Sequence, residues 1–266
     1  MLHPHRSGTA FLGATYLLNQ KCMANSLYLY GIFPQPGPQN LNLEGLDKQP
    51  VQAYRVDDFV FLYSEAQQER YLASRRNLLG HERVLEQAME QGYRTLLPLQ
   101  FGLIIDSWDL VKEQLLETRG ESLKQLLHKL EGRREVGVKV FWEPDRELET
   151  LMQENDALRT KRDQLEGKSL SMDEIVRIGQ AIEQAMLARK EGIVEVFQKM
   201  LNPFAVERVE NDILTDTMIY NAAYLIPWEV EPEVSEAVEA LDHQFEDRLR
   251  IRYNNFTAPF NFAQLN

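Results

Sequence analysis

The residues of this sequence that could hold a metal are scattered along the chain. His81-Glu82 begins a helical stretch in the way a zinc-protease helix begins, where a second histidine four positions after the first shares its helix face. Leu85 stands at that position here, and His128 and His243 are each the single histidine of a predicted helix. We therefore predict that the chain holds no metal.

The candidate nucleophiles and phosphate-binding glycines are equally isolated. The serines lie in expected caps, helices or loops, where neither a strained turn nor a neighbouring base would activate them. Cys22 has no nearby base, and Gly31, Gly37 and Gly45 are interleaved with prolines and lack the Lys-Ser/Thr of a phosphate loop. The sequence thus predicts no catalytic residue and no cofactor, and it favours a binding or assembly protein over an enzyme.

Composition limits the partners and the compartment. The 266 residues carry 41 acidic and 29 basic side chains, and the net charge of -12 repels nucleic acids and anionic membranes. We interpret the pairs Arg75-Arg76 and Arg133-Arg134 and the acidic stretch 229–236 as solvated charges. A single cysteine allows no intrachain disulfide and fits a reducing cytoplasm. We predict a cytoplasmic protein that binds neither nucleic acid nor lipid membrane.

The first half of the chain indicates a domain over residues 23–134, after a leader (1–22) that we expect to be disordered. Residues 94–105 are a long, nearly uncharged apolar run that indicates a buried strand despite Pro98 and Gly102. The other elements, in chain order, are strand 27–33, a hairpin of strands 51–56 and 59–63 with the second one central in the sheet, helix 77–91, and a helix from Asp106 or Ser107 to Leu130 that Gly120 could interrupt.

The second half indicates a domain over residues 135–256 that contains a helical hairpin (145–200). The first arm of the hairpin carries leucines at heptad spacing, and the second arm begins at the capping-box pattern of Ser171 and Glu174. The elements in order are strand 136–142, helix 147–166 with Leu151, Leu158 and Leu165, the helix from Ser171, strands 204–209 and 219–228, a helix after Pro232, and strand 249–256. This order is the split βαβ of a ferredoxin-like sheet.

We therefore predict an α+β fold of two domains with antiparallel sheets. The second is ferredoxin-like with an inserted helical hairpin, and the first is a modified ferredoxin-like sheet. A short aromatic tail (257–266) ends the chain. Its rings must either cover a bare face of this protein or dock on a partner, and the sequence leaves both alternatives open.

Several stretches, taken in order, resemble the gas vesicle protein F/L family. They are 27–32, His81 with Val84 and Glu86, 96–102, 135–142, 221–226 and the Pro-aromatic tail. The resemblance spans about residues 26–263, and the ordered series is more specific than any single stretch. The tail residues 257–262 depart from the Gly-Pro-Trp-Pro-Pro-Tyr form of many members and look closer to the F branch.

The resemblance implies a non-enzymatic accessory component of gas vesicles that works in the cytoplasm in association with the vesicle. Its implied partner is the small, very hydrophobic main shell protein, with other gas vesicle accessory proteins as further candidates. It would help to nucleate or build the shell and limit aggregation of the shell protein. We assign the partner contacts to Phe256, Pro259, Phe260 and Phe262. The alternative function is a small-ligand sensor built on paired ferredoxin-like domains.

Overall fold

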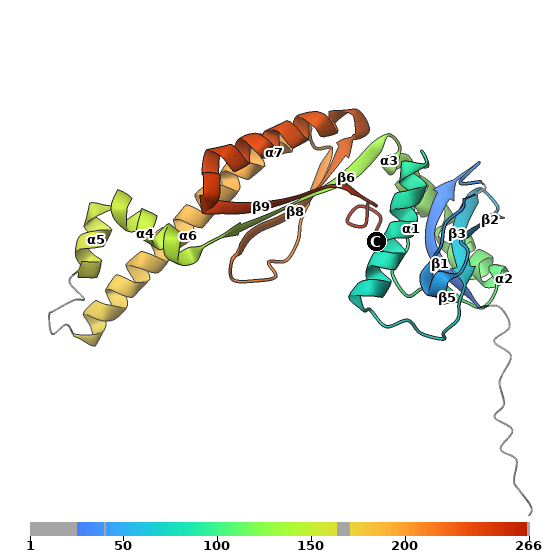
Figure 1. The fold of residues 1–266 in the computed structure, drawn as a ribbon, viewed down its shortest axis with the longest axis horizontal. Helices are drawn as coiled ribbons and strands as arrows, with labels where there is room; N and C mark the ends of the chain where they lie inside the picture. Colours follow the sequence, from blue (N-terminus) through green and yellow to red (C-terminus); the bar gives the residue numbers. More distant parts are fainter. Residues whose placement is uncertain (1–25, 40, 164–170, 265–266) are drawn as a thin grey trace, which may run out of the picture.

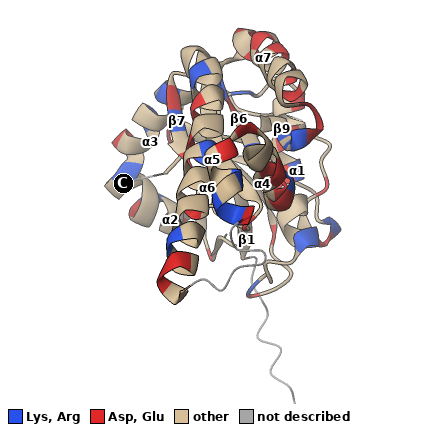
Figure 2. Ribbon diagram, turned by 90° about the vertical axis from the view of Figure 1, so that its left-hand side faces the viewer, with Lys and Arg blue, Asp and Glu red and all other residues tan. Residues whose placement is uncertain are grey.

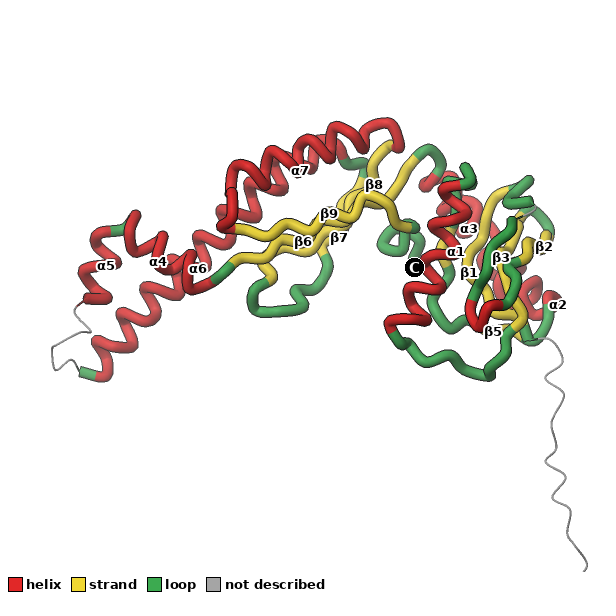
Figure 3. Tube along the Cα trace, viewed as in Figure 1, coloured by secondary structure: helices red, strands yellow, loops and turns green. Residues whose placement is uncertain are grey.

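The computed structural model describes residues 26–39, 41–163 and 171–264. A domain built on one sheet, a domain built on a second sheet and a helical arm follow one another along the longest axis of the molecule (Figure 1). The expected leader, including Cys22, lies outside the described residues, as does Leu165. The predicted fold class is confirmed, because both sheets are antiparallel and helices pack against each (Figure 3).

The first sheet has the strand order β2-β3-β1-β4, with β5 also paired to β1. All of its pairs are antiparallel, and β3 is central as the sequence predicts. The loop from β1 to β2, with a 3-10 turn at Leu46–Lys48, takes the place of a crossover helix. The strands are β1 (Leu27–Pro34), β2 (Gln52–Val56), β3 (Phe59–Glu65), β4 (Leu97–Pro98) and β5 (Ile104–Ile105).

The single strand predicted over residues 94–105 is wrong, because only β4 and β5 at its two ends pair with the sheet. Pro98 has no N–H to give to a ladder, and Gly102 has a φ of +88°, which turns the chain. The intervening loop is nevertheless tied to β1. The Leu99 N–H donates to the Tyr30 carbonyl, and the Gly102 N–H donates to the Tyr28 hydroxyl at 3.0 Å.

Both faces of the first sheet are covered by helices. Helix α1 (Arg75–Glu90) packs over Tyr28 and Tyr30, whereas the opposite face packs against α2 (Trp108–Val111) and α3 (Glu117–Leu130). The predicted interruption at Gly120 is wrong, since that residue lies inside α3 and the irregular part is a π-turn at Lys112–Leu116. Of the two expected caps it is Ser107 whose hydroxyl accepts from the Leu110 N–H.

The second sheet has the strand order β7-β8-β6-β9 with antiparallel neighbours throughout, which is the order of the predicted split βαβ arrangement. Its strands are β6 (Arg133–Trp142), β7 (Glu207–Glu210), β8 (Met218–Pro227) and β9 (Leu249–Thr257). Helices α6 (Met172–Leu201) and α7 (Glu231–Phe245) cover one face through a shared apolar core. Strand β7 begins later than predicted because Asn202–Phe204 forms a 3-10 turn.

The predicted helical hairpin forms the arm, in which α4 (Pro144–Glu154) and α5 (Asp156–Asp163) pack against α6. The continuous first helix predicted over 147–166 is wrong, because the chain turns at Asn155, whose side chain then accepts from the Leu158 N–H. Both hydrogen bonds of the capping box at Ser171 and Glu174 are present. The predicted domain boundaries stay a prediction.

Candidate functional site

His81, the first candidate ligand in the sequence, is buried and structural. It is 1% exposed, and its Nδ1 lies 2.9 Å from the Tyr28 hydroxyl while its Nε2 lies 3.0 Å from the Leu99 carbonyl. A carbonyl only accepts, so Nε2 carries the proton and Nδ1 accepts from Tyr28. Burial lowers the pKa of His81 from 6.5 to about 4, which keeps the ring neutral. Within the described residues no group of three His, Cys, Asp or Glu side chains could hold a metal ion.

The chain ends between the two domains (Figure 1), and the four residues assigned to partner binding lie at the end of β9 and in the tail that follows it. Phe262 is 2% exposed, packed with Leu225 of the second sheet and the core under α3, and Pro259 is also buried. Phe256 and Phe260 are half-buried against the core under α1. The structure thus shows the first of the two sequence alternatives, packing on the same chain, and partner binding by these residues stays a prediction.

A buried carboxylate fastens this tail. Glu135 is 4% exposed, and its two oxygens accept from the Asn261 N–H at 2.9 Å and from the Asn261 side-chain amide at 2.6 Å. Burial raises the pKa of Glu135 to about 7, although these two hydrogen bonds act in the opposite direction. Sequence reasoning missed this residue. The sequence did hold one sign of it, because Glu135 is a charged residue directly before the apolar strand predicted at 136–142.

Arg134 of β6 holds the end of β9, directly before the tail, against Trp228. Its guanidinium lies 4.3 Å from the ring centre of Trp228 and 5.4 Å from that of Phe256, and it donates to the Asn255 carbonyl. Burial lowers the pKa of Arg134 below its ordinary value. The interpretation of Arg133-Arg134 as a solvated pair is therefore wrong for Arg134, which is 8% exposed.

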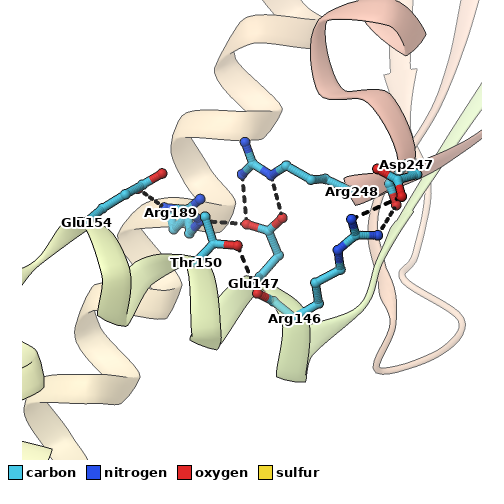
Figure 4. Close-up of polar contacts among 7 residues, drawn as sticks. All are labelled: Arg146, Glu147, Thr150, Glu154, Arg189, Asp247 and Arg248. Atoms are coloured by element: carbon cyan, nitrogen blue, oxygen red, sulfur yellow. Dashed lines mark hydrogen bonds and ion pairs between the residues drawn. The ribbon is translucent and has the colours of Figure 1, made fainter.

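The arm is fixed to the second domain by a buried ionic network (Figure 4). The Glu147 carboxylate of α4, whose side chain is fully buried, accepts two hydrogen bonds from Arg248 at 2.8 and 2.9 Å. Arg189 of α6 donates to the same carboxylate at 2.5 Å and to Glu154 at 2.7 Å. Burial alone would raise the pKa of Glu147, but the hydrogen bonds from Arg248 and Arg189 hold it below the ordinary value.

This network sets the direction of the arm, because one carboxylate ties α4, α6 and the segment after α7 together. A second ion pair, Arg146 with Asp247 at 3.0 Å, lies beside it (Figure 4). Sequence reasoning missed the network since its members lie far apart in the chain. The only local signal was that Glu147 stands four positions before Leu151 and so shares the buried side of α4.

A groove with both apolar and polar lining lies between α6 and the loop that joins β7 to β8, and we call it the α6 groove. Its volume is about 450 Å³, and its apolar lining is Leu187, Val194, Ile213 and Ile219. Leu187 and Ile213 are each 46% exposed. The rim is mostly acidic, with Glu191, Glu195 and Glu210 beside a single lysine, Lys190. Such a groove can take an apolar segment of another polypeptide while its charged rim stays in water.

Further apolar side chains are exposed at the start of α6, at the end of the arm. Met172 is 74% exposed, Ile175 44% and Val176 48%. These residues extend the apolar surface of α6 away from the α6 groove. Among the helices in the described part of the chain, none is both long enough and apolar enough to cross a membrane.

Known proteins resemble this chain in both sequence and fold. The family described as gas vesicle synthesis protein GvpL/GvpF matches residues 26–264. Gas vesicle protein F of Dolichospermum flosaquae is 58% identical over 243 residues, covering 91% of this chain and 99% of that protein. The crystal structure of GvpF from Anabaena has a TM-score of 0.80 at 52% identity, covering 91% of this chain and 97% of that one. GvpF from Microcystis aeruginosa has a TM-score of 0.79 at 56% identity, covering 90% and 99%.

Proposed function

Because the chain belongs to the family of gas vesicle synthesis proteins GvpL/GvpF, we propose that it is a non-enzymatic accessory protein that binds the hydrophobic main shell protein. In this proposal it works in the cytoplasm, where it limits aggregation of the shell protein while vesicles are nucleated or assembled. The resemblance inferred from the sequence is confirmed at the level of the family, and the relatives compared above carry the F name.

The α6 groove is the observation that supports this proposal best. Leu187 and Ile213 are half-exposed, and covering each of them would contribute about 1 kcal/mol to binding. A hydrophobic shell subunit aggregates through its own apolar surface unless another surface covers it. The acidic rim and the net charge of -12 would then keep the complex dispersed.

The aromatic tail is a second candidate surface for the same function. Phe256 and Phe260 are half-buried, so part of each ring is accessible, whereas Pro259 and Phe262 are buried. Binding through all four would require the tail to leave its place between the two domains, which costs the contacts of Phe262 and the Glu135–Asn261 hydrogen bonds. We therefore favour the α6 groove over the tail as the surface that meets the shell protein.

Capture of purified shell protein by variants tests the two surfaces. Leu187→Glu together with Ile213→Glu would place two charges in the interface, and we expect capture to weaken about a hundredfold. Leu72→Glu together with Leu79→Glu is the matched control, since these leucines are 74% and 51% exposed on the first domain. Circular dichroism checks that each variant is folded.

The capture results distinguish the α6 groove from the aromatic tail as the site that binds the shell protein. Loss of capture with the groove variant and not with the control supports the proposal. Capture that survives the groove changes but is lost with Phe260→Ala moves the site to the tail. Capture that survives both removes shell-protein binding by either surface.

The small-ligand sensor remains the alternative function, and a cleft between the domains is the observation in its favour. The cleft has a volume of about 500 Å³, within the range of ligand sites, and is lined in part by Lys139, Arg252 and Glu82. A ligand that bound there would raise the melting temperature in proportion to the logarithm of its concentration above the dissociation constant. A thermal-shift screen of metabolites that finds no such compound would argue against the sensor.

A further inference from the structure

The face of the second sheet opposite to α6 and α7 carries three exposed basic side chains. Lys139 of β6 pairs with Arg252 of β9, and the next outward-facing pair is Phe141 with Arg250. The guanidinium groups of Arg250 and Arg252 lie 4.6 and 5.1 Å from the ring centre of Phe141, which holds them side by side. We call Lys139, Arg250 and Arg252 the basic face.

The basic face has no acidic partner within the described residues. No carboxylate there lies within 4.0 Å of any of its three cations. Glu82 of α1 lines the same cleft as Lys139 and Arg252 and still forms no ion pair with them. Three uncompensated cations gathered on one sheet face are unexpected in a chain with a net charge of -12, and they favour an acidic occupant.

The other side of the same domain supplies an acidic surface. Helix α7 contains no Lys or Arg, and Figure 2 shows red but no blue along it. Four of its exposed carboxylates form no ion pair with any described residue, and we call them the acidic helix face: Glu233, Glu236, Glu239 and Asp242. Glu236 and Glu239 lie on the side of α7 opposite to Val234 and Leu241, which fill the core. Glu233 and Asp242 lie on the two flanks of the helix between these sides.

We propose that the acidic helix face of one copy docks on the basic face of a second copy. The two surfaces lie on opposite sides of one sheet, so the contact joins different patches and leaves each copy with one unused patch. Such a head-to-tail contact repeats into a chain of copies unless its rotation closes a ring. This self-association is separate from the α6 groove and does not depend on the proposed function.

The net negative charge of each copy opposes association at long range, but it does not prevent the contact. At physiological salt the Debye length is about 8 Å, so charges elsewhere on the two copies are largely screened. Carboxylates that meet Lys139, Arg250 and Arg252 directly are screened much less, because they approach to hydrogen-bond distance. Because the charges on both surfaces are exposed before they meet, the contact is expected to be weak, and about 0.5 M salt should weaken it further.

Charge exchange between two variants tests the proposal. Arg250→Glu with Arg252→Glu makes the basic face acidic, and Glu236→Lys with Glu239→Lys makes the acidic helix face basic. We expect each variant alone to stay monomeric in sedimentation at about 150 mM salt, where the wild-type chain gains mass with concentration. An equal mixture of the two should associate again, since each variant then meets an opposite charge on the other.

A charge-matched variant of α1 and a higher salt concentration are the two controls. Arg75→Glu with Arg76→Glu changes the net charge by the same amount as the basic-face variant but alters exposed residues of α1, and it should associate like the wild type. About 0.5 M salt should lower the association constant of the wild type at least tenfold. A wild-type chain that stays monomeric at about 150 mM salt overturns the proposal, and so does a mixture that fails to associate although both variants show native circular dichroism.

Discussion

Replacing Phe262 with alanine should lower the free energy of unfolding by about 4 kcal/mol. The ring is 2% exposed and belongs to the buried cluster that also contains Leu225 of the second sheet and Leu123 and Leu127 of α3, so it helps to fill the core shared by both domains. A phenylalanine buries about 150–250 Å² of mostly apolar surface, and at about 25 cal/mol per Å² this amounts to about 4–6 kcal/mol. The methyl group that alanine keeps, and partial collapse of the cavity, bring the loss toward the lower figure.

Urea unfolding followed by circular dichroism measures this loss. Phe260→Ala is the matched control in the same tail, and because Phe260 is only half-buried we expect a loss of about 1–2 kcal/mol. Phe262→Leu keeps most of the apolar volume and should cost less than about 1.5 kcal/mol. The order of the three variants therefore follows the buried volume that each removes.

A loss below about 1 kcal/mol for Phe262→Ala would refute the reasoning, because a ring buried between two domains cannot be removed at so small a cost. The same experiment bears on the tail as a partner site. If Phe262 mainly met a partner, the alanine variant would keep its stability and lose capture of the shell protein. If it mainly joined the domains, stability would fall first.

Three further results are expected. Glu147→Ala should cost about 3 kcal/mol in urea unfolding, since it leaves Arg189 and Arg248 uncompensated, whereas Glu154→Ala at the exposed end of the network should cost less than about 1 kcal/mol. Because the folded pKa of His81 is about 4 against 6.5 ordinarily, the contribution of His81 to the free energy of unfolding should fall by about 3 kcal/mol as pH drops from 6.5 to 4, and the difference between the wild type and His81→Gln measures it. Glu135 acts in the opposite sense. Its folded pKa of about 7 against 4.5 means that its contribution to stability is full below pH 4.5 and falls by about 3 kcal/mol as pH rises to 7. The two contributions largely cancel in the wild type between pH 4.5 and 6.5, so Glu135→Gln should leave the slope of His81 visible there.

Local patterns were enough to predict most elements and the order of the second sheet. The period of apolar residues identified α1 and α6, and the capping box at Ser171 and Glu174 fixed the start of α6. Short runs rich in aromatic and apolar residues identified β1 and β3, and the two apolar faces of β3 indicated its central place. The predicted elements were wrong where residues far away in the chain provide the hydrogen-bond partners of the backbone. In the run 94–105, side-chain and backbone groups of Tyr28 and Tyr30 take the place of ladder partners, so an apolar sequence could remain a loop.

The candidate surfaces were harder to predict because each depends on register and packing between residues far apart in the chain. Lys139 and Arg252 gather on one face only because β6 and β9 pair antiparallel at those positions, and a shift of one residue would turn one of them into the core. Glu147 and Arg248 meet only because the arm folds back on the segment after α7. Sequence alone shows that such charges exist. The sheet register decides that the basic residues share a side opposite to the acidic helix, and it is this sidedness that makes docking between copies physically reasonable.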